Sequence, residues 1–228
     1  MPKYVGQSNA YDIPNNTIYM GDLLYSWDVG DDLTGWTLGG NTVPTIAVDG
    51  RLKLYDNSVA ALSNSMCRIA IPNTMGQLYC IFKCKFTQMA DDTSTDDRKV
   101  VIQIEPGVVN ENGHLFLFNK GTNSSTHRFW NTSYLGSGTI GLAWVPVAGI
   151  EYELSLIMTP KSLIMLINGV MMDSIPISNK GTAPSSLTPL ADWLKTNKTI
   201  QFFVRHLANE VSHYRIRDIR VSAYRGQS

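Results

Sequence analysis

The sequence predicts an all-β protein built as an antiparallel β-sandwich. Residues 151–178 contain three successive segments in which apolar and polar side chains alternate, the pattern of strands with one buried face. Similar segments recur along most of the chain at intervals of roughly 8–12 residues, the spacing typical of sandwiches. Tight-turn residues separate many of them. Together these observations favour two packed antiparallel sheets.

The segment 151–178 is expected to form a meander of three strands, at residues 151–158, 162–167 and 170–177. The apolar face of its first strand consists of Tyr152, Leu154, Leu156 and Met158. Asn168-Gly169 joins the second strand to the third and signals a type I′ turn, in which both central residues have positive φ. The meander is the strongest local indication of a sheet.

Other strands are predicted at residues 17–20, 35–38, 44–48, 51–55, 66–71, 77–86, 99–105, 114–119, 199–206 and 212–224. Asp49-Gly50 signals a tight hairpin between two of them. In the last segment the apolar parity slips by one, which predicts a β-bulge at Arg217-Asp218. One short helix is expected near residues 188–195, with Thr188 as its cap and Pro189 at its first position.

The chain is predicted to have two parts: an extended N-terminal arm over residues 1–22 and a single β-sandwich domain over residues 23–228. The arm is polar and shows little alternation. Its apolar side chains Tyr4, Val5, Tyr11 and Ile13 favour an arm that becomes ordered against a partner. A disordered terminus is the alternative.

Composition narrows the classes of function. Lys plus Arg and Asp plus Glu number 19 each, so the formal net charge is zero. This balance argues against nonspecific nucleic-acid binding, which needs a basic surface, and it permits self-association. No run of ~18 apolar residues predicts a membrane span. The first residues lack the apolar core of a signal peptide, so we expect synthesis in a reducing cytoplasm.

The cysteines fit that compartment. Cys80 and Cys84 are four residues apart in one predicted strand, on the same face as Phe82 and Phe86. Neighbours along an extended strand cannot reach disulfide geometry. They are therefore interpreted as small core hydrophobes rather than as a disulfide or metal pair.

Three segments resemble the concanavalin A-like lectin/glucanase superfamily. DDLTGWTL…VDGRLKLYD resembles its opening Gly-Trp strand and DGRL hairpin, residues 150–177 resemble its late meander, and YRIRDIRVSAY resembles its closing strand. Together they span most of residues 24–224. The resemblance implies a two-sheet antiparallel jelly-roll β-sandwich, and its motifs mark the fold rather than a chemistry.

The superfamily includes glycoside hydrolases, lectins, adhesive modules, and tail and capsid-surface domains of phages. The arm, the polar uncharged surface and the missing export signal favour the last group. We therefore expect a non-enzymatic bacteriophage virion protein, a capsid decoration, head-fibre or tail-fibre component. It would be located in the virion, form a homo-oligomer and dock onto other virion proteins through residues 1–22. A stand-alone carbohydrate-binding module is the alternative, and a glycoside hydrolase is less favoured.

No catalytic residue is assigned. The glucanases of this superfamily carry their carboxylates on one strand as E-x-D-x-x-E, and no such string occurs here. Glu151 and Glu153 share a strand face, but this face is expected to point into solvent. The four histidines are dispersed, and no serine lies in a G-x-S-x-G elbow.

The candidate glycan-binding residues come from an aromatic and polar stretch, residues 126–144. They are Arg128, Trp130, Asn131, Tyr134 and Trp144. Aromatic platforms beside amide and charged groups suit sugars, and surface glycans are the expected ligand. In the alternative interpretation Phe129 and Trp130 straddle a strand, one in the core and one in a subunit contact.

A loop at residues 90–97 supplies the candidate metal site. Its four carboxylates are Asp91, Asp92, Asp96 and Asp97. Calcium prefers such oxygen ligands, so calcium is the one cofactor left open. A solvated acidic hairpin tip is the alternative, and no other cofactor is expected.

Overall fold

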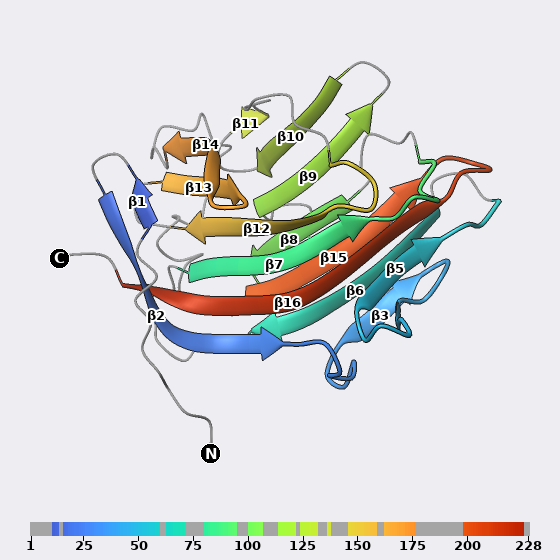
Figure 1. The fold of residues 1–228 in the computed structure, drawn as a ribbon, viewed down its shortest axis with the longest axis horizontal. Coiled ribbons are helices and arrows are strands. Elements are labelled where there is room, and N and C mark those ends of the chain that lie inside the picture. Colours follow the sequence, from blue (N-terminus) through green and yellow to red (C-terminus); the bar gives the residue numbers. More distant parts are fainter. Residues whose placement is uncertain are drawn as a thin grey trace, which may run out of the picture.

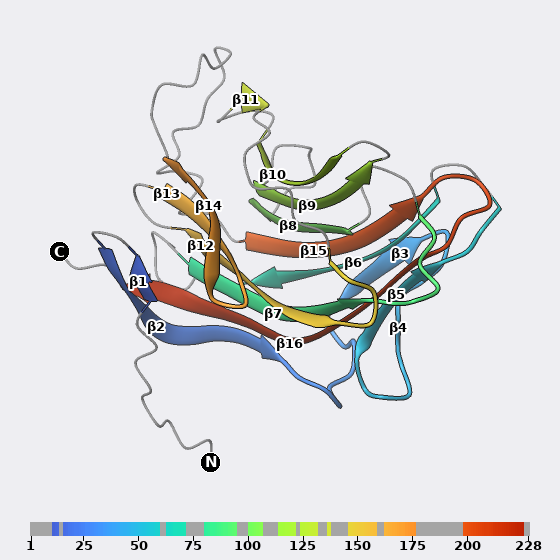
Figure 2. The same ribbon diagram turned by 45° about the horizontal axis from the view of Figure 1, so that its top comes forward.

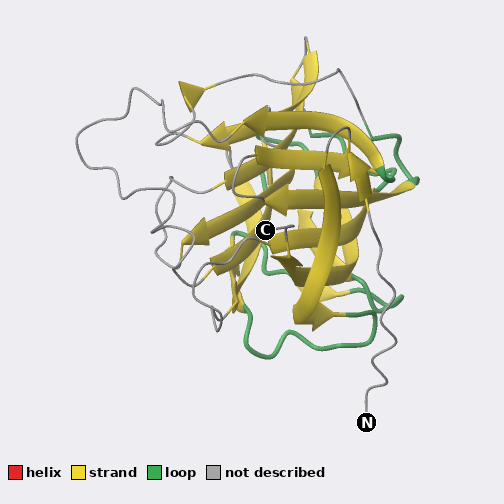
Figure 3. Ribbon diagram, turned by 90° about the vertical axis from the view of Figure 1, so that its left-hand side faces the viewer, coloured by secondary structure: helices red, strands yellow, loops and turns green. Residues whose placement is uncertain are grey.

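The computed structural model describes the chain except for residues 1–10, 14–15, 60–62, 72–79, 95–99, 107–113, 122–123, 132–135, 138–145, 159–161, 177–197 and 226–228. All secondary structure in the described part is β-strand, and Figure 3 shows no helix there. The helix predicted near residues 188–195 lies outside the described residues. Within that part, no helix is long and apolar enough to cross a membrane.

The first layer, called the large sheet, has nine antiparallel strands. Its main path runs β1 (Tyr11–Ile13), β2 (Asn16–Trp27), β16 (Ser212–Arg225), β7 (Cys80–Gln88), β12 (Glu151–Met158), β13 (Ser162–Ile167), β14 (Val170–Pro176). Two further strands, β4 (Thr45–Ile46) and β5 (Leu52–Asp56), join it because β5 also pairs with β16.

The second layer, called the small sheet, has seven antiparallel strands. In order they are β11 (Gly136–Ser137), β10 (Ser124–Asn131), β9 (His114–Gly121), β8 (Val100–Pro106), β15 (Lys198–His206), β6 (Ser63–Ile71), β3 (Thr37–Gly40). Figures 1 and 2 show the two sheets stacked face to face. In Figure 2, β8, β9 and β10 bow with their concave side away from the large sheet.

The hydrophobic core lies between the sheets. Phe82, Phe86 and Tyr214 of the large sheet and Phe202 of the small sheet are fully buried. Trp36 joins the layers, since its ring centroid lies 6.0 Å from that of Phe202. Each such side chain contributes about 1.5–3 kcal/mol by leaving water. These contacts fix which face of each sheet points inward.

Several local predictions are confirmed. Strands β12 and β13 have their predicted bounds. Asn168 and Gly169 have φ of 50° and 77°, as a type I′ turn requires. The register of β16 against β7 shifts between Arg217 and Arg220, and Asp218 has φ of 52°, so the predicted bulge is present.

The hairpin signalled by Asp49-Gly50 has a longer loop than a two-residue turn. Ala47 and Arg51 close it, since the Ala47 N–H donates to the Arg51 carbonyl at 2.8 Å. The Gly50 N–H donates to the Ala47 carbonyl at 2.8 Å, and Gly50 has φ of 76°. A left-handed glycine after a turn is the usual end of a three-residue hairpin loop. A Cβ at position 50 would also lie 2.6 Å from Cγ1 of Val29.

The structure adds to the prediction at two places. Residues 124–131, which are not among the predicted strands, form strand β10. The predicted division after residue 22 falls inside β2, which runs from Asn16 to Trp27 and pairs with β16. Of the proposed docking residues, Tyr11 and Ile13 lie in β1, whereas Tyr4 and Val5 lie outside the described residues. The arm as a separate docking unit stays a prediction.

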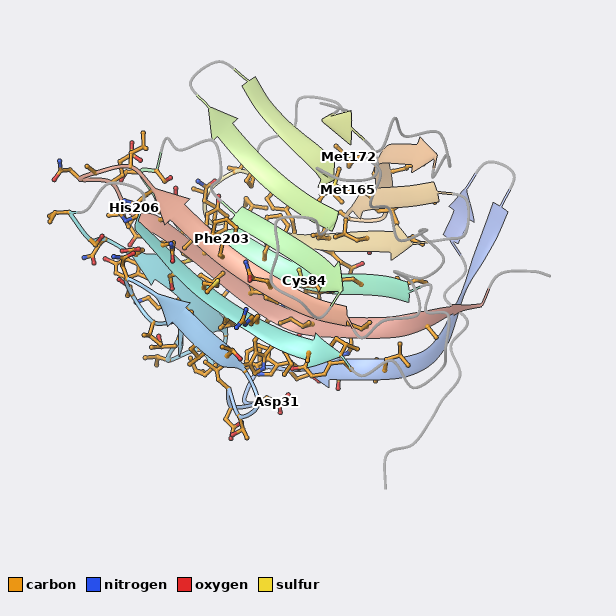
Figure 4. The ribbon with its side chains drawn as sticks, turned by 180° about the vertical axis from the view of Figure 1, so that it is seen from behind. Asp31, Cys84, Met165, Met172, Phe203 and His206 are labelled. Atoms are coloured by element: carbon orange, nitrogen blue, oxygen red, sulfur yellow. The ribbon has the colours of Figure 1, made fainter. Side chains whose placement is uncertain are left out.

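The two cysteines with described side chains, Cys67 and Cys84, are buried and free. Burial raises the pKa of both thiols. Figure 4 shows Cys84 and Met165 among the ribbons of the sandwich. The interpretation of Cys84 as a core hydrophobe is confirmed.

Candidate functional site

One row of paired residues crosses the whole small sheet. From one edge to the other it consists of Thr37, Arg68, Gln201, Gln103, Leu115, Trp130 and Ser137. Directly paired residues in antiparallel strands belong to the same face of a sheet. The register therefore brings positions far apart in sequence into one line.

The neighbouring row shows which face this is. It consists of Leu38, Cys67, Phe202, Ile102, Phe116 and Phe129. Cys67 and Phe202 are fully buried in the core between the sheets. Because successive residues of a strand alternate between faces, position 129 lies on the inner face and position 130 on the outer face. The prediction that Phe129 and Trp130 straddle a strand agrees with this register.

Arg68 and Gln201 are opposite one another on this outer face. Gln201 is only 9% exposed, and Arg68 is half-buried. Neither side chain makes a hydrogen bond or an ion pair with any residue that the structure describes. One guanidinium and one amide therefore lie side by side, and neither bonds to a residue of the described part of the chain.

An apolar pair adjoins these two polar residues. Met66 pairs with Phe203, each two positions along its strand from Arg68 or Gln201, and both are half-buried. Gly39 pairs with Met66 at the edge, where an added Cβ would lie 3.2 Å from the Met66 Cε. Figure 4, seen from the side of the small sheet, labels Phe203 on β15. Polar donors beside an apolar floor can hold a ligand that has both hydroxyl groups and C–H faces.

The structure places only some of the predicted glycan-binding residues on the outer face of the small sheet. Arg128 pairs with Leu117 and lies two residues from Trp130, so both positions are on the outer face of the small sheet. Asn131 pairs with Gly136 and has the opposite parity. Tyr134 and Trp144 lie outside the described residues. Sequence reasoning missed Arg68 and Gln201, because only the pairing of β6 with β15 brings them together.

The acidic loop after β7 makes polar contacts with strand β16 of the same chain. The Asp92 carboxylate accepts hydrogen bonds from the Gln88 side-chain amide at 3.2 Å and from the His213 backbone N–H at 2.9 Å. Asp91 Oδ1 lies 2.7 Å from His213 Nδ1. Burial lowers the pKa of His213, although the Asp91 carboxylate opposes that shift. Asp91 and Asp92 therefore fasten the loop to β16.

The calcium prediction is not tested by these contacts. Asp96 and Asp97 lie outside the described residues. Among the residues that the structure describes, no group of three or more His, Cys, Asp and Glu could hold a metal ion. Calcium binding at this loop stays a prediction.

Glu151 and Glu153 lie on the outer face of the large sheet but are not simply solvated. Arg217 donates to both carboxylate oxygens of Glu151, at 2.6 and 2.7 Å. These bonds are the main reason why the pKa of Glu151 is lowered. Oε1 of Glu153 lies 3.9 Å from Nζ of Lys83. A glycosidase acid needs a raised pKa, so Glu151, whose pKa is lowered, is unsuited to that role.

A second His–Asp contact is closed to solvent. His206 Nε2 lies 3.3 Å from Asp56 Oδ1, and both side chains have 0% exposure. Asp56 also accepts hydrogen bonds from the Thr42 hydroxyl and the Ser58 N–H. Figure 4 labels His206 at one end of the sandwich. The pair joins β15 to the loops around β5 and has no access to a substrate.

Comparison with known proteins was made by sequence and by fold. No family model matches the chain, and no curated protein matches it. The Lotus tetragonolobus seed lectin matches with a TM-score of 0.61 and 14% identity over 90% of this chain and 100% of that one. A winged bean acidic lectin complexed with methyl-α-D-galactose matches at 0.62 and 10% identity, over 88% and 98%. The fold is lectin-like.

A third similar structure is a Bacillus subtilis protein of unknown function with a galectin-like fold. Its TM-score is 0.57 at 13% identity, over 91% of this chain and 98% of that one. The predicted all-β jelly-roll sandwich of two antiparallel sheets is therefore confirmed. At these identities the similarity establishes the fold, and the ligand has to be argued from the residues of this chain.

Proposed function

We propose that this protein binds carbohydrate along the outer face of the small sheet. The observation that carries the proposal is the row from Arg68 through Gln201 and Gln103 to Trp130, which crosses the concave face of a lectin-like sandwich. The winged bean lectin of similar fold is complexed with a galactoside, which supports the same class of ligand here.

The chemistry of the row supports a sugar. Amide and guanidinium groups donate hydrogen bonds in fixed directions, and sugar hydroxyls can accept them. Aromatic side chains provide apolar surface with a polar handle, which suits the C–H face of a pyranose. A face formed by strands is also well preorganised, since the sheet holds its residues at fixed spacing.

Binding is favoured over hydrolysis. Glycoside hydrolysis ordinarily needs two carboxyl groups across the scissile bond. On the outer face of the described strands of the small sheet, Glu105, which pairs with Thr199, is the single acidic position. The acidic pair Glu151 and Glu153 belongs to the other sheet and is engaged by Arg217 and Lys83. A non-enzymatic binding protein fits this distribution.

A glycan array probed with the full chain tests the proposal. We expect selective binding that falls at least about tenfold in Trp130→Ala, a loss of roughly 1.4 kcal/mol. Tyr55→Ala is the matched control, because it removes an aromatic ring from the outer face of the large sheet. Wild-type signals at background, or equal losses in both variants, would contradict the proposal.

The virion role, the docking through residues 1–22 and the homo-oligomeric state stay predictions. None of the three similar structures named above is a virion protein by its description. Deleting residues 1–10, which precede β1, should weaken attachment to a particle if that prediction holds, and leave glycan binding intact.

A further inference from the structure

We propose that the ligand is an acidic oligosaccharide and that Arg68, supported by Gln201, receives its carboxylate. This inference rests on the proposed function and specifies its ligand. It assigns a role to two residues whose side chains have no hydrogen-bond or ion-pair partner among the residues that the structure describes.

Arg68 differs from the other arginines whose side chains are described. Arg51, Arg215, Arg217 and Arg220 each form an ion pair with an Asp or Glu of the large sheet or its loops. Arg68 forms none with a described residue. A guanidinium has a planar fork of donors that matches a carboxylate with two parallel hydrogen bonds. An external carboxylate would accept two hydrogen bonds from Arg68, as the Glu151 carboxylate does from Arg217.

Gln201 strengthens the assignment. Its side chain is more than nine-tenths buried, directly opposite Arg68, and makes no hydrogen bond with a described residue. A side-chain amide has two N–H donors and a carbonyl acceptor, so it can bond to a group that reaches Arg68. Paired residues in neighbouring strands have Cβ atoms about 4.5–5.5 Å apart, so one ligand group can contact both. The amide can donate to the carboxylate or to an adjacent hydroxyl.

The charge of the surrounding positions favours an anion. Arg68, Arg128 and Arg205 all occupy outer-face positions of the small sheet, in β6, β10 and β15. Glu105 is the single acidic position on the described strands of that face. This excess contrasts with the zero net charge of the whole chain.

The same row sets the length of the ligand. Positions 68 and 130 lie four strand spacings apart, from β6 through β15, β8 and β9 to β10. At about 4.8 Å per spacing the two positions are separated by ~19 Å. A monosaccharide cannot reach from Arg68 to Trp130, so a ligand that contacts both is an oligosaccharide.

The test uses the full chain on an array of matched oligosaccharides, each printed with its carboxylates free and as methyl esters. Uronic-acid and sialic-acid series are both included, which identifies the source of the carboxylate. We expect the free acids to bind at least tenfold more tightly than their esters. Arg68→Gln should reduce this ratio to about one, and Gln201→Leu should reduce it by several-fold.

Arg220→Gln is the control, because it removes the same charge from the outer face of the large sheet. It should leave the acid-to-ester ratio unchanged. Equal binding of acids and esters by the wild type, or an unchanged ratio in Arg68→Gln, would overturn the inference. In that event Trp130-dependent binding of the esters would still support the proposed function, whereas its absence would remove both. An unchanged thermal unfolding temperature of Arg68→Gln would show that its loss of selectivity for free acids is not caused by a loss of the fold.

Discussion

The outer faces of the two sheets use polar residues in opposite ways. On the large sheet, charged side chains face one another across strands, as Arg217 does with Glu151 and Lys85 with Asp218. On the small sheet, Arg68 and Gln201 lie side by side without a described partner. Both faces are formed by antiparallel strands, although Arg217 and Asp218 belong to the β-bulge of β16, whereas Arg68 and Gln201 lie in a regular register.

This difference distinguishes polar groups that pair within the protein from polar groups that a ligand could contact. Cross-strand ion pairs on the large sheet stabilise its pairing and leave few donors unused. On the small sheet, Arg68 and Gln201 donate to no residue that the structure describes, so they add no such pairing there. Polar groups that the fold does not need are the ones a ligand can engage.

The largest expected effect comes from a substitution in the core between the two sheets, on which both outer faces depend. Phe202 is fully buried between the sheets and contacts the rings of Trp36 and Phe82. Phe202→Ala should lower the free energy of unfolding by about 3–5 kcal/mol, because it leaves a cavity where the layers meet. Chemical denaturation monitored by tryptophan fluorescence measures the change. A loss under ~1 kcal/mol would mean that the layers do not depend on this contact.

A smaller effect distinguishes the two faces. Arg217→Ala removes both hydrogen bonds to Glu151 and should cost roughly 1 kcal/mol of unfolding free energy, near the upper end for exposed ion pairs. Arg68→Ala should cost less than ~0.5 kcal/mol, since the structure gives it no ion pair to lose. Urea denaturation of the two variants gives both values. A larger cost at Arg68 than at Arg217 would reverse the comparison.

The smallest effect is a pH dependence confined to the large sheet. The pKa of Glu151 lies below its usual value of 4.5 because Arg217 donates to its carboxylate. A carboxyl with a depressed folded pKa stabilises the protein above its unfolded pKa, and this contribution is lost as pH falls through the folded value. Glu151→Gln should therefore flatten the stability profile below about pH 4.5, whereas Gln201→Leu should leave its slope unchanged. Thermal unfolding across that range makes the comparison.

The sequence predicts features whose causes are local. Alternation predicts the bounds of β12, the Asn168-Gly169 pair predicts the turn between β13 and β14, and the parity slip predicts the bulge at Asp218. Strand β10 is not among the strands predicted from alternation, because its polar and aromatic residues show no clear apolar face. Its regularity depends on pairing with β9, which is a tertiary property.

The candidate site was less accessible to sequence reasoning. Trp130 and Arg128 could be proposed from composition, because aromatic and charged residues cluster there. Arg68 and Gln201 are neighbours only through the register of β6 and β15, which are widely separated along the chain. No periodicity specifies that register. The contrast between paired and unpaired arginines likewise emerges only when both sheets are assembled.

The position of β16 has a consequence for biosynthesis. It is flanked by β2 and β5 on one side and by β7 on the other, so it occupies the middle of its sheet although it follows all the other described strands in the sequence. A nascent chain that ends before residue 212 leaves the edges of β2 and β7 open to other chains. Ribosome-stalled intermediates should therefore be aggregation-prone until this strand emerges and closes the layer.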